Sequence, residues 1–165
     1  MHGVDNGFIL FNNFRIPRLN LLNRFSDVTE EGKFKTQIES SDQRFALQLG
    51  ALGTGRIMVL YSCTTAIEMA IKIAIRFAAM RQQFGKPNEP EISLIEYPLH
   101  QQRLFPILAK TLTYKIVCQK VIQMWGKKQK HLFTPNNAKL AELHALISVM
   151  KVMSSIESYE DIKQC

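Results

Sequence analysis

The chain is poor in the residues that build disulfide-stabilised, collagen-like or low-complexity proteins. Its 165 residues include three cysteines, eight glycines and six prolines. The odd number and wide separation of Cys63, Cys118 and Cys165 exclude a disulfide framework and a paired-cysteine metal site. Apolar residues at 46% and charged residues at 21% are typical of a globular chain and argue against a disordered one.

Long uninterrupted apolar runs and a leader-like N-terminus are also missing. No run of about eighteen apolar residues lacks a charge, and the first residues show no basic-then-apolar pattern. These absences argue against a transmembrane or secreted protein. Together with the unpaired cysteines, they favour a reducing compartment.

What the chain has in excess is positive charge. Lysine and arginine number 21 against 14 acidic residues, a net charge of +7 that favours phosphate-bearing partners without identifying them. A basic nucleic-acid-binding module is one alternative, drawing on Lys110, Lys115, Lys120 and the segment 126–131. It is weakened because no recognisable nucleic-acid-binding motif is present and a charge cluster at a loop is usually a solvated surface. A purely structural bundle that mediates association is another alternative.

The four histidines offer no metal site by their spacing. They stand far from one another and from cysteine in the sequence, so no ligand pattern of the zinc type is formed. His144 is interpreted instead as a histidine at the edge of the core. The histidines are His2, His100, His131 and His144.

Both ends of the chain resemble internal points of a longer protein. Residues Gly7–Pro17 form a β-rich stretch, and its one candidate partner is the short segment Gly32–Gln37, so at most a hairpin is expected. The last periodic segment stops at Cys165 without a glycine, asparagine or proline to end a helix. We therefore expect an internal fragment.

Three long helical segments are predicted between these ends. Ser40 or Ser41 is suited to cap the first of them, and Asn136 or Asn137 to cap the third. The predicted segments run from about Asp42 to Arg81, from Leu94 to Trp125, and from the asparagine cap to the C-terminus, with a basic turn from Gly126 to Pro135.

Glycine and proline mark the expected weak points of these helices. Gly50, Gly53 and Gly55 predict a loosening of the first helix. Pro98 is tolerated in the first turn of the second helix, whereas Pro106 removes a backbone donor inside it and predicts a bend.

Apolar residues recur at helical spacing in the first and third segments. This spacing indicates a mainly α fold, an antiparallel long-helix bundle of the four-helix type with one helix missing. The recurring positions are Leu60, Ile67, Ile71, Ala74 and Ala78, followed by Leu140, Leu143, Ile147 and Met150.

Charge on the first helix is confined to one narrow stripe. Between Ile57 and Met80 the charged residues are Glu68, Lys72 and Arg76, four residues apart and therefore on one side of the helix. We expect the remaining surface of this helix to face protein.

Two arginines, one before and one after this stripe in the sequence, are predicted to lie on the opposite side of the helix. On a continuous helix Arg56 and Arg81 share nearly one azimuth away from the stripe, about 37 Å apart along the axis. A buried guanidinium stays charged and needs a carboxylate or a ligand phosphate. Alternatively, Arg81 interacts with the dipole at the helix end. Gly53 and Gly55 favour either approach of a ligand or contact between helices.

The segment Ala78-Ala-Met-Arg-Gln-Gln-Phe-Gly85 resembles the RxQFG signature of the acyl-coenzyme A dehydrogenase and oxidase superfamily. Further blocks resemble peroxisomal acyl-CoA oxidases in the same order, and three blocks are most similar to the pristanoyl, branched-chain type. The former are residues 3–8, 14–18, 27–33, 95–106 and 142–146, and the latter are residues 43–46, 52–56 and 94–98.

This resemblance implies a fold and a reaction. Residues 1–39 would be the end of a middle β-domain with its connector, and residues 40–165 the truncated first C-terminal helical bundle. The whole enzyme would be a peroxisomal homodimer that shares FAD across its interface and has neither a nucleic-acid nor a membrane partner. It would desaturate acyl-CoA to trans-2-enoyl-CoA and pass electrons to dioxygen, giving hydrogen peroxide. The alternative is a dehydrogenase that reduces an electron-transfer flavoprotein.

The resemblance also implies which residues act. No catalytic residue is expected here, because the general-base glutamate of the family would lie beyond Cys165; Glu142, Glu157 and Glu160 are interpreted as solvated helix residues. No metal is expected. Residues that match FAD-contacting positions are Arg81, Gln82, Gln83, Phe84, Gln101 and Gln102, and those that match substrate-contacting positions are Gly53, Thr54, Gly55 and Arg56.

Overall fold

The computed structural model describes residue 3, residues 5–129 and residues 138–165. The chain divides into two compact units, residues 1–44 and 45–165. The division falls five residues after the predicted boundary at residue 39. That the first unit is the end of a β-domain remains a prediction.

A short hairpin is the regular element of the first unit. Strands β1 (Ser26–Val28) and β2 (Phe34–Thr36) pair antiparallel, with Ser26 opposite Thr36. The turn between them requires Gly32, whose φ of 78° lies in the left-handed region that favours glycine. A 3-10 turn, η1 (Arg18–Asn20), precedes the hairpin. The predicted hairpin is therefore present, but with a different first strand.

The stretch Gly7–Pro17, predicted as a strand, is not one. The structure places these residues in irregular chain, and their large apolar side chains are exposed, Phe8 at 92%. A strand needs a partner for its backbone donors and acceptors, and no described segment pairs with this one. The β-rich composition alone could not supply that partner.

The first predicted helix is present, and it is interrupted near the glycines as expected. Helix α1 (Ser41–Gly50) is followed by α2 (Leu52–Met80), and the residue between them, Ala51, keeps helical angles of φ −60° and ψ −26°. The backbone N–H of Gln43 donates to Ser40 Oγ at 3.4 Å, so Ser40 is the capping residue of α1.

The second helix begins later and ends later than predicted. Residues Leu94–Glu96 form a 3-10 turn, η2, and α3 runs from Pro98 to Gln129 with Pro106 inside it. Pro98 occupies the first helical position, where its missing N–H leaves no helical bond unmade. Helix α3 continues through Gly126, so the predicted loop start at this residue is wrong.

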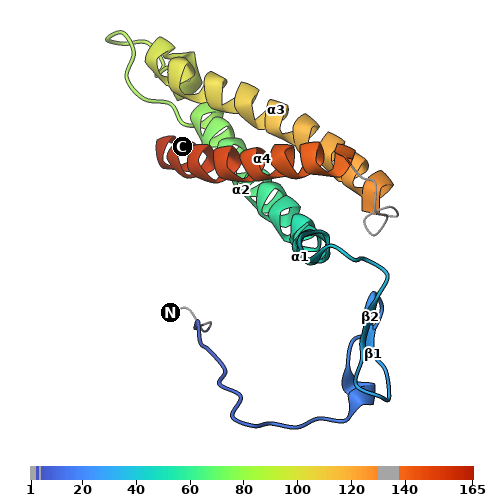
Figure 1. Cartoon of the computed structure of the whole chain (residues 1–165). Helices are drawn as coiled ribbons and strands as arrows, with labels where there is room; N and C mark the ends of the chain where they lie inside the picture. Colours follow the sequence, from blue (N-terminus) through green and yellow to red (C-terminus); the bar gives the residue numbers. More distant parts are fainter. Residues whose placement is uncertain (1–2, 4, 130–137) are drawn as a thin grey trace. The chain divides into compact units, whose positions relative to one another are not determined.

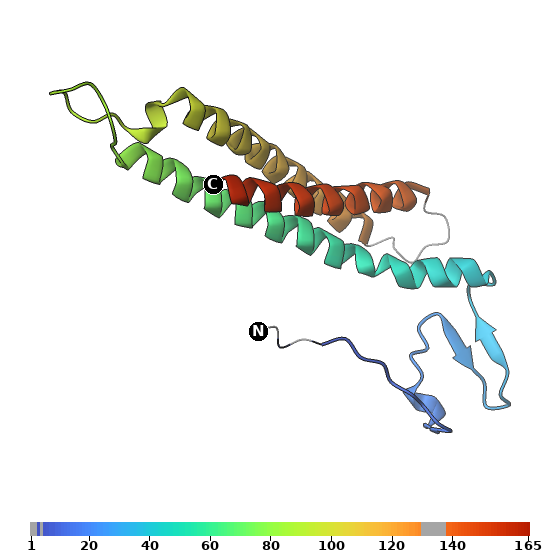
Figure 2. The same cartoon turned by 90° about the vertical axis from the view of Figure 1, so that its left-hand side faces the viewer.

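Helix α4 (Ala138–Gln164) completes an antiparallel bundle with α2 and α3 (Figure 1). Figure 2 shows that α2 and α4 run in the same direction and that α3 runs in the opposite direction. The predicted caps Asn136 and Asn137, and most of the predicted basic loop, lie outside the described residues.

The core of the bundle lies along the predicted apolar stripes. Leu60, Ile67, Ile71 and Ala78 of α2 are fully buried, as is Ile147 of α4. One buried cluster joins all three helices, and a second joins α2, η2 and α3 towards the loop end. The first comprises Ile57, Leu60, Tyr114, Cys118, Val121, Trp125, Leu143 and Ile147, and the second Ile67, Ile71, Ala78, Leu104 and Ile107.

The outer side of α2 is also apolar, and the described part of this chain leaves it uncovered. Met58, Met69, Ile73 and Phe77 are more than half exposed. The segment Ser41–Met80 is long and apolar enough to cross a membrane despite its charges, a feature that the run-length criterion overlooked. Its inner side nevertheless packs on α3 and α4 as a bundle helix does.

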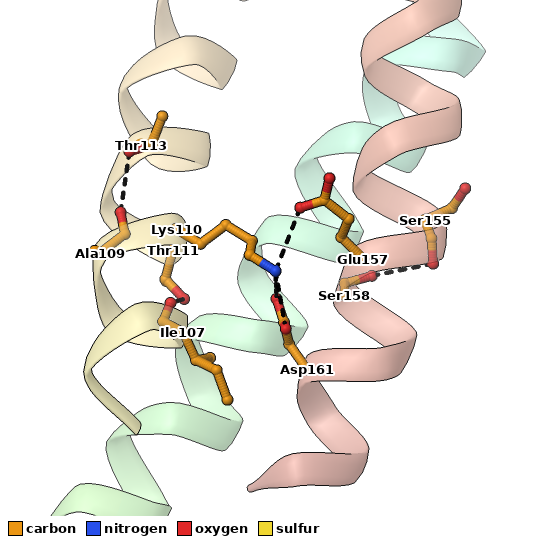
Figure 3. A network of polar contacts seen from close by, with 9 residues as sticks. All are labelled: Ile107, Ala109, Lys110, Thr111, Thr113, Ser155, Glu157, Ser158 and Asp161. Carbon is orange, nitrogen blue, oxygen red and sulfur yellow. Dashed lines mark hydrogen bonds and ion pairs between the residues drawn. The ribbon is translucent and has the colours of Figure 1, made fainter. Parts of the chain in front are cut away.

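A charged network fastens α4 to α3 (Figure 3). Lys110 Nζ of α3 lies 2.8 Å from Asp161 Oδ2 and 3.4 Å from Glu157 Oε2, both of α4. Asp161 raises the pKa of Lys110, while burial and Glu157 raise the pKa of Tyr114 to about 12. Glu157 is therefore a structural partner rather than the solvated residue we expected.

We predict that Asp161→Asn lowers the free energy of unfolding by about 1–3 kcal/mol, because Lys110 loses the buried charge that compensates its own. Glu160→Gln is the matched control, since Glu160 pairs with Lys163 on the surface with both side chains more than half exposed. This control should change stability by less than about 0.5 kcal/mol. Chemical denaturation of the full-length protein measures both, and equal effects would contradict the prediction.

Candidate functional site

The predicted site residues fall at two opposite ends of the bundle. At the end where α2 begins, Arg56 is half-buried and its Nη1 lies 3.0 Å from Nδ1 of His144 on α4. A guanidinium has donors only, so His144 Nδ1 accepts this hydrogen bond. The histidine is thereby neutral, with its proton on Nε2.

The surroundings of His144 favour this neutral form. Burial and the charge of Arg56 both lower the pKa of His144. The imidazole meets the Trp125 ring edge to face, with ring centroids 6.1 Å apart, and Trp125 Nε1 donates to Thr54 Oγ1 at 3.2 Å. Three helices therefore contribute to one polar cluster around Arg56.

Gly53 is required by the approach of α3 to α2. A Cβ at this position would overlap the six-membered ring of Trp125, coming within 2.8 Å of Cζ2 and Cζ3. The two interpretations of the glycines are thus separated: Gly53 makes helix contact, whereas nothing lies within 4 Å of a Cβ at Gly55.

The expectation that Arg56 is buried against an anion is met only in part. Its side chain is half-buried, but its partner is a neutral imidazole. Within residues 5–129 and 138–165, no carboxylate lies within ion-pair distance of Arg56. The charge of the guanidinium is therefore not neutralised by the described part of the chain.

At the opposite end, the placement of Arg81 on the dry side of the helix is wrong. Helix α2 ends at Met80, and Arg81 is extended, with φ −76° and ψ 123°, and exposed. The azimuth argument assumed a continuous helix, which the structure does not have there. Ser93 Oγ lies 2.9 Å from the carbonyl oxygens of both Ala78 and Ala79, and its single hydroxyl proton is shared between them at the end of the helix.

The chain after Arg81 returns on itself in a tight hairpin-like loop. Gln83 N donates to Ile92 O and Ile92 N to Phe84 O, each at 3.0 Å. These bonds hold Phe84 at φ 62°, a left-handed conformation that is uncommon for a bulky residue, and the residue is 67% exposed. Strained, exposed residues of this kind cluster at ligand-binding sites.

The start of α3 is tied to this loop. Tyr97 Oη donates to Gln83 O at 2.8 Å, and Gln101 Nε2 donates to Ile95 O at 2.9 Å. Gln101 keeps its amide oxygen and one amide N–H without a partner among the described residues, and Gln102 is exposed. The structure thus brings the predicted residues 81–84 and 101–102, which are apart in sequence, to the same end of the bundle.

A pocket of about 310 Å³ lies at this end. Its walls are mostly apolar, and it contains two basic side chains that we did not predict, His100 and Arg103. The sequence offered little indication of this location, because both residues lie inside the family-like block 95–106 and match no position with a known role. The lining residues are Phe84, Leu94, Tyr97, Leu99, His100 and Arg103.

The remaining candidate groups lie elsewhere. Glu142 is exposed, and Glu160 pairs with Lys163 on the surface. Cys63 is half-buried, Cys118 is buried and Cys165 is exposed, each as a free thiol. Among the described residues, no three histidine, cysteine or acidic side chains cluster as metal ligands would.

A long-helix antiparallel bundle with an RxQFG turn at one end and an arginine near the other has the architecture of the C-terminal helical domains of acyl-CoA-oxidising flavoproteins. The family model of the acyl-CoA oxidase C-alpha1 domain matches residues 49–165. The chain belongs to the acyl-CoA oxidase family.

Relatives agree with this assignment over nearly the whole chain. It is 36% identical over 159 residues to peroxisomal acyl-coenzyme A oxidase 2 of Arabidopsis thaliana, covering 96% of this chain and 22% of that protein. It is 37% identical over 169 residues to human peroxisomal acyl-coenzyme A oxidase 3, covering 99% and 24%. The chain thus spans less than a quarter of these relatives.

Solved structures support the fold. Acyl-CoA oxidase-2 of Caenorhabditis elegans, solved bound with FAD, ascaroside-CoA and ATP, superposes with a TM-score of 0.77 at 27% identity, over 93% of this chain and 22% of that one. The predicted incomplete bundle is thereby confirmed as an acyl-CoA oxidase fold.

We predict that Gly53→Ala lowers the free energy of unfolding by about 1–3 kcal/mol, because its methyl group overlaps Trp125. Gly55→Ala is the control: its methyl group meets open space, and alanine is the better helix former by about 1 kcal/mol. We expect it to be neutral or stabilising. Thermal unfolding of the full-length protein compares the two, and a stable Gly53→Ala protein would disprove the close contact.

We predict that His144 destabilises the fold as the pH falls. Its pKa in the folded protein is lowered from 6.5, so the unfolded chain binds the proton first and protonation favours unfolding below about pH 6.5. The measurement is the drop in Tm of the full-length protein between about pH 7.5 and pH 5.5. His144→Asn should show a smaller drop than the wild type, and an equal drop would refute the linkage.

Proposed function

We propose that this chain forms the first C-terminal helical domain of a peroxisomal, flavin-dependent acyl-CoA oxidase. The supporting observation is the gathering of residues 81–84 and 101–102 at one end of a bundle of the acyl-CoA oxidase family. The names of the curated relatives support the peroxisome as the location. The catalytic glutamate would be supplied by a part of the enzyme outside these residues.

The donors at the loop end suit a flavin nucleotide. Arg81 is exposed and has no ion-pair partner among the described residues, so it is free to bind a diphosphate with directional, charge-assisted hydrogen bonds. Phe84 offers an exposed aromatic face beside a largely apolar pocket of about 310 Å³, which fits one part of a dinucleotide. Gln101 and Gln102 add amide groups.

The role of these residues is to hold and orient FAD, which when bound accepts a hydride from the β-carbon of the acyl chain. Arg81, Gln82, Gln83 and Phe84 approach the nucleotide from the loop. We place this flavin mainly on the neighbouring subunit of a homodimer, so that the exposed loop end becomes covered on assembly. The apolar outer side of α2 is compatible with such burial.

At the other end, Arg56 with Thr54 and Gly55 would contact acyl-CoA near its thioester. The guanidinium is half-buried with no carboxylate to neutralise it, so it is suited to attract a negatively charged or polarised group. Gly53 contributes to this site by letting Trp125 pack beneath it. The substrate and the flavin would thus be served by opposite ends of α2.

The electron acceptor distinguishes an oxidase from a dehydrogenase, and the preferred acyl chain tests the resemblance to the branched-chain type. An oxidase releases hydrogen peroxide from acyl-CoA and dioxygen, whereas a dehydrogenase needs an electron-transfer flavoprotein. Purified full-length protein should show flavin absorbance and acyl-CoA-dependent peroxide formation, and branched acyl-CoA should be preferred if the pristanoyl-type resemblance holds. A flavin-free protein that binds DNA in a salt-sensitive manner would instead support the nucleic-acid alternative.

We predict that Arg81→Ala weakens FAD retention by about ten- to hundredfold, the loss expected for one charge-assisted hydrogen bond pair. Arg76→Ala is the control, because Arg76 is also exposed but lies on the helix surface before the loop. Flavin content after gel filtration and FAD titration of the apoprotein measure both. Unchanged flavin content in Arg81→Ala, or an equal loss in Arg76→Ala, would count against the assignment.

A further inference from the structure

The family-like block Glu142-Leu-His-Ala-Leu146 contains His144, the one side chain among the described residues that hydrogen-bonds the Arg56 guanidinium. His144 Nδ1 and Arg56 Nη1 are 3.0 Å apart although the residues stand 88 positions apart in the chain. The contact joins α4 to α2 at the level where Thr54 and Gly55 begin the proposed substrate site. It is therefore placed to control where the guanidinium points.

The histidine ring packs against Trp125, which is itself held at two points. Its ring stands at 86° to the Trp125 ring, and Trp125 is in turn anchored by the hydrogen bond to Thr54 and by its seat over Gly53. Packing of this kind restricts the imidazole to one orientation, with Nδ1 towards Arg56.

Holding Arg56 in place also reduces the entropic cost of binding a ligand. A flexible arginine side chain loses rotamer freedom when it is held, and here that loss occurs during folding rather than on ligand binding.

The chemistry of the partner matters as much as its position. Arginines in protein interiors are commonly paired with carboxylates, which fix the guanidinium and also neutralise it. A neutral imidazole accepts the same hydrogen bond and leaves the positive charge in place. An arginine fixed in this way keeps its full attraction for an anionic or polarised group of a ligand.

We propose that His144 is a positioning residue of the acyl-CoA site: it fixes Arg56 through a neutral acceptor and so leaves the guanidinium charge available to the substrate. The inference rests on the proposed function of Arg56. It goes beyond that function by assigning the orienting group, on a different helix, and by requiring that this group carry no charge.

Three substitutions at one position separate geometry from charge. Asparagine carries Oδ1 on Cγ, where histidine carries Nδ1, so His144→Asn keeps a neutral acceptor. His144→Asp places a charged acceptor at the same point, and His144→Leu keeps apolar volume without an acceptor. Ser148→Ala is the control for local disturbance of α4, because Ser148 Oγ donates to the His144 carbonyl and not to its ring.

The first measurement is equilibrium binding, without turnover, of a non-oxidisable thioether analogue of acyl-CoA to the full-length, FAD-loaded enzyme. We expect Kd within about threefold of the wild type for His144→Asn and Ser148→Ala. We expect Kd raised about ten- to hundredfold for His144→Leu, because Arg56 is no longer held, and for His144→Asp, because Arg56 is neutralised. FAD content and Tm verify that each variant is folded.

The second measurement is the split between KM and kcat for acyl-CoA oxidation. Rescue by asparagine but not by aspartate is the signature of a neutral positioning acceptor, since a merely structural histidine would be replaced equally well by either. Equal Kd values for the asparagine and aspartate variants would overturn the charge requirement. A leucine variant that binds as the wild type does would overturn the positioning role.

Failure of this inference is distinguishable from failure of the proposed function. A wild-type enzyme that retains FAD and releases peroxide, but whose His144 variants all bind the analogue alike, keeps the oxidase proposal and loses the role of His144. Arg56→Met with unchanged analogue binding in that active enzyme overturns the substrate role of Arg56 together with this inference. Wild-type protein that neither binds the analogue nor forms peroxide overturns the proposed function itself.

Discussion

Burial of the inner side of α2 against α3 and α4 is the constraint on which the rest of the bundle depends. Leu60 of α2 and Ile147 of α4 share one core cluster with Trp125 of α3, and this cluster fixes the distance between the helices. Trp125 fits because Gly53 carries no side chain. The same contact orients His144, so a feature of core packing also shapes the polar cluster around Arg56.

Arg56 near the start of α2 and Arg81 just past its end are presented in opposite ways, and each arrangement suits a different kind of ligand contact. Arg56 is held inside the bundle by a neutral partner, so its charge is fixed in place before a ligand arrives. Arg81 lies past the helix end, exposed on a loop whose backbone is itself strongly constrained at Phe84. An exposed arginine of this kind is suited to a partner that covers it on assembly, whereas a half-buried one is suited to a ligand that enters the same subunit.

Local patterns predicted the elements well where a single helix decides the outcome. The apolar spacing in α2 and α4 placed the core, Ser40 was predicted as a cap, and Pro98 was accepted at a helix start. These local patterns gave wrong predictions where the structure of a segment depends on another part of the chain. Gly7–Pro17 has strand composition but nothing described to pair with, and Arg81 has the right azimuth on a helix that has already ended. Family-like motifs pointed to residues 81–84 and 101–102 as cofactor contacts, but not to His100 and Arg103, which line a pocket together with Phe84.

The sequence by itself determined the class of fold, the family and the residue types at each end of α2, because periodicity and short motifs are local properties of the chain. Only the tertiary structure decided which groups meet: His144 with Arg56, Trp125 over Gly53, and Lys110 between Glu157 and Asp161. These contacts join different helices far apart in sequence, and their distances depend on how closely the helices pack. The protonation state of His144 follows from those distances, since burial and a neighbouring cation exist only in the folded bundle.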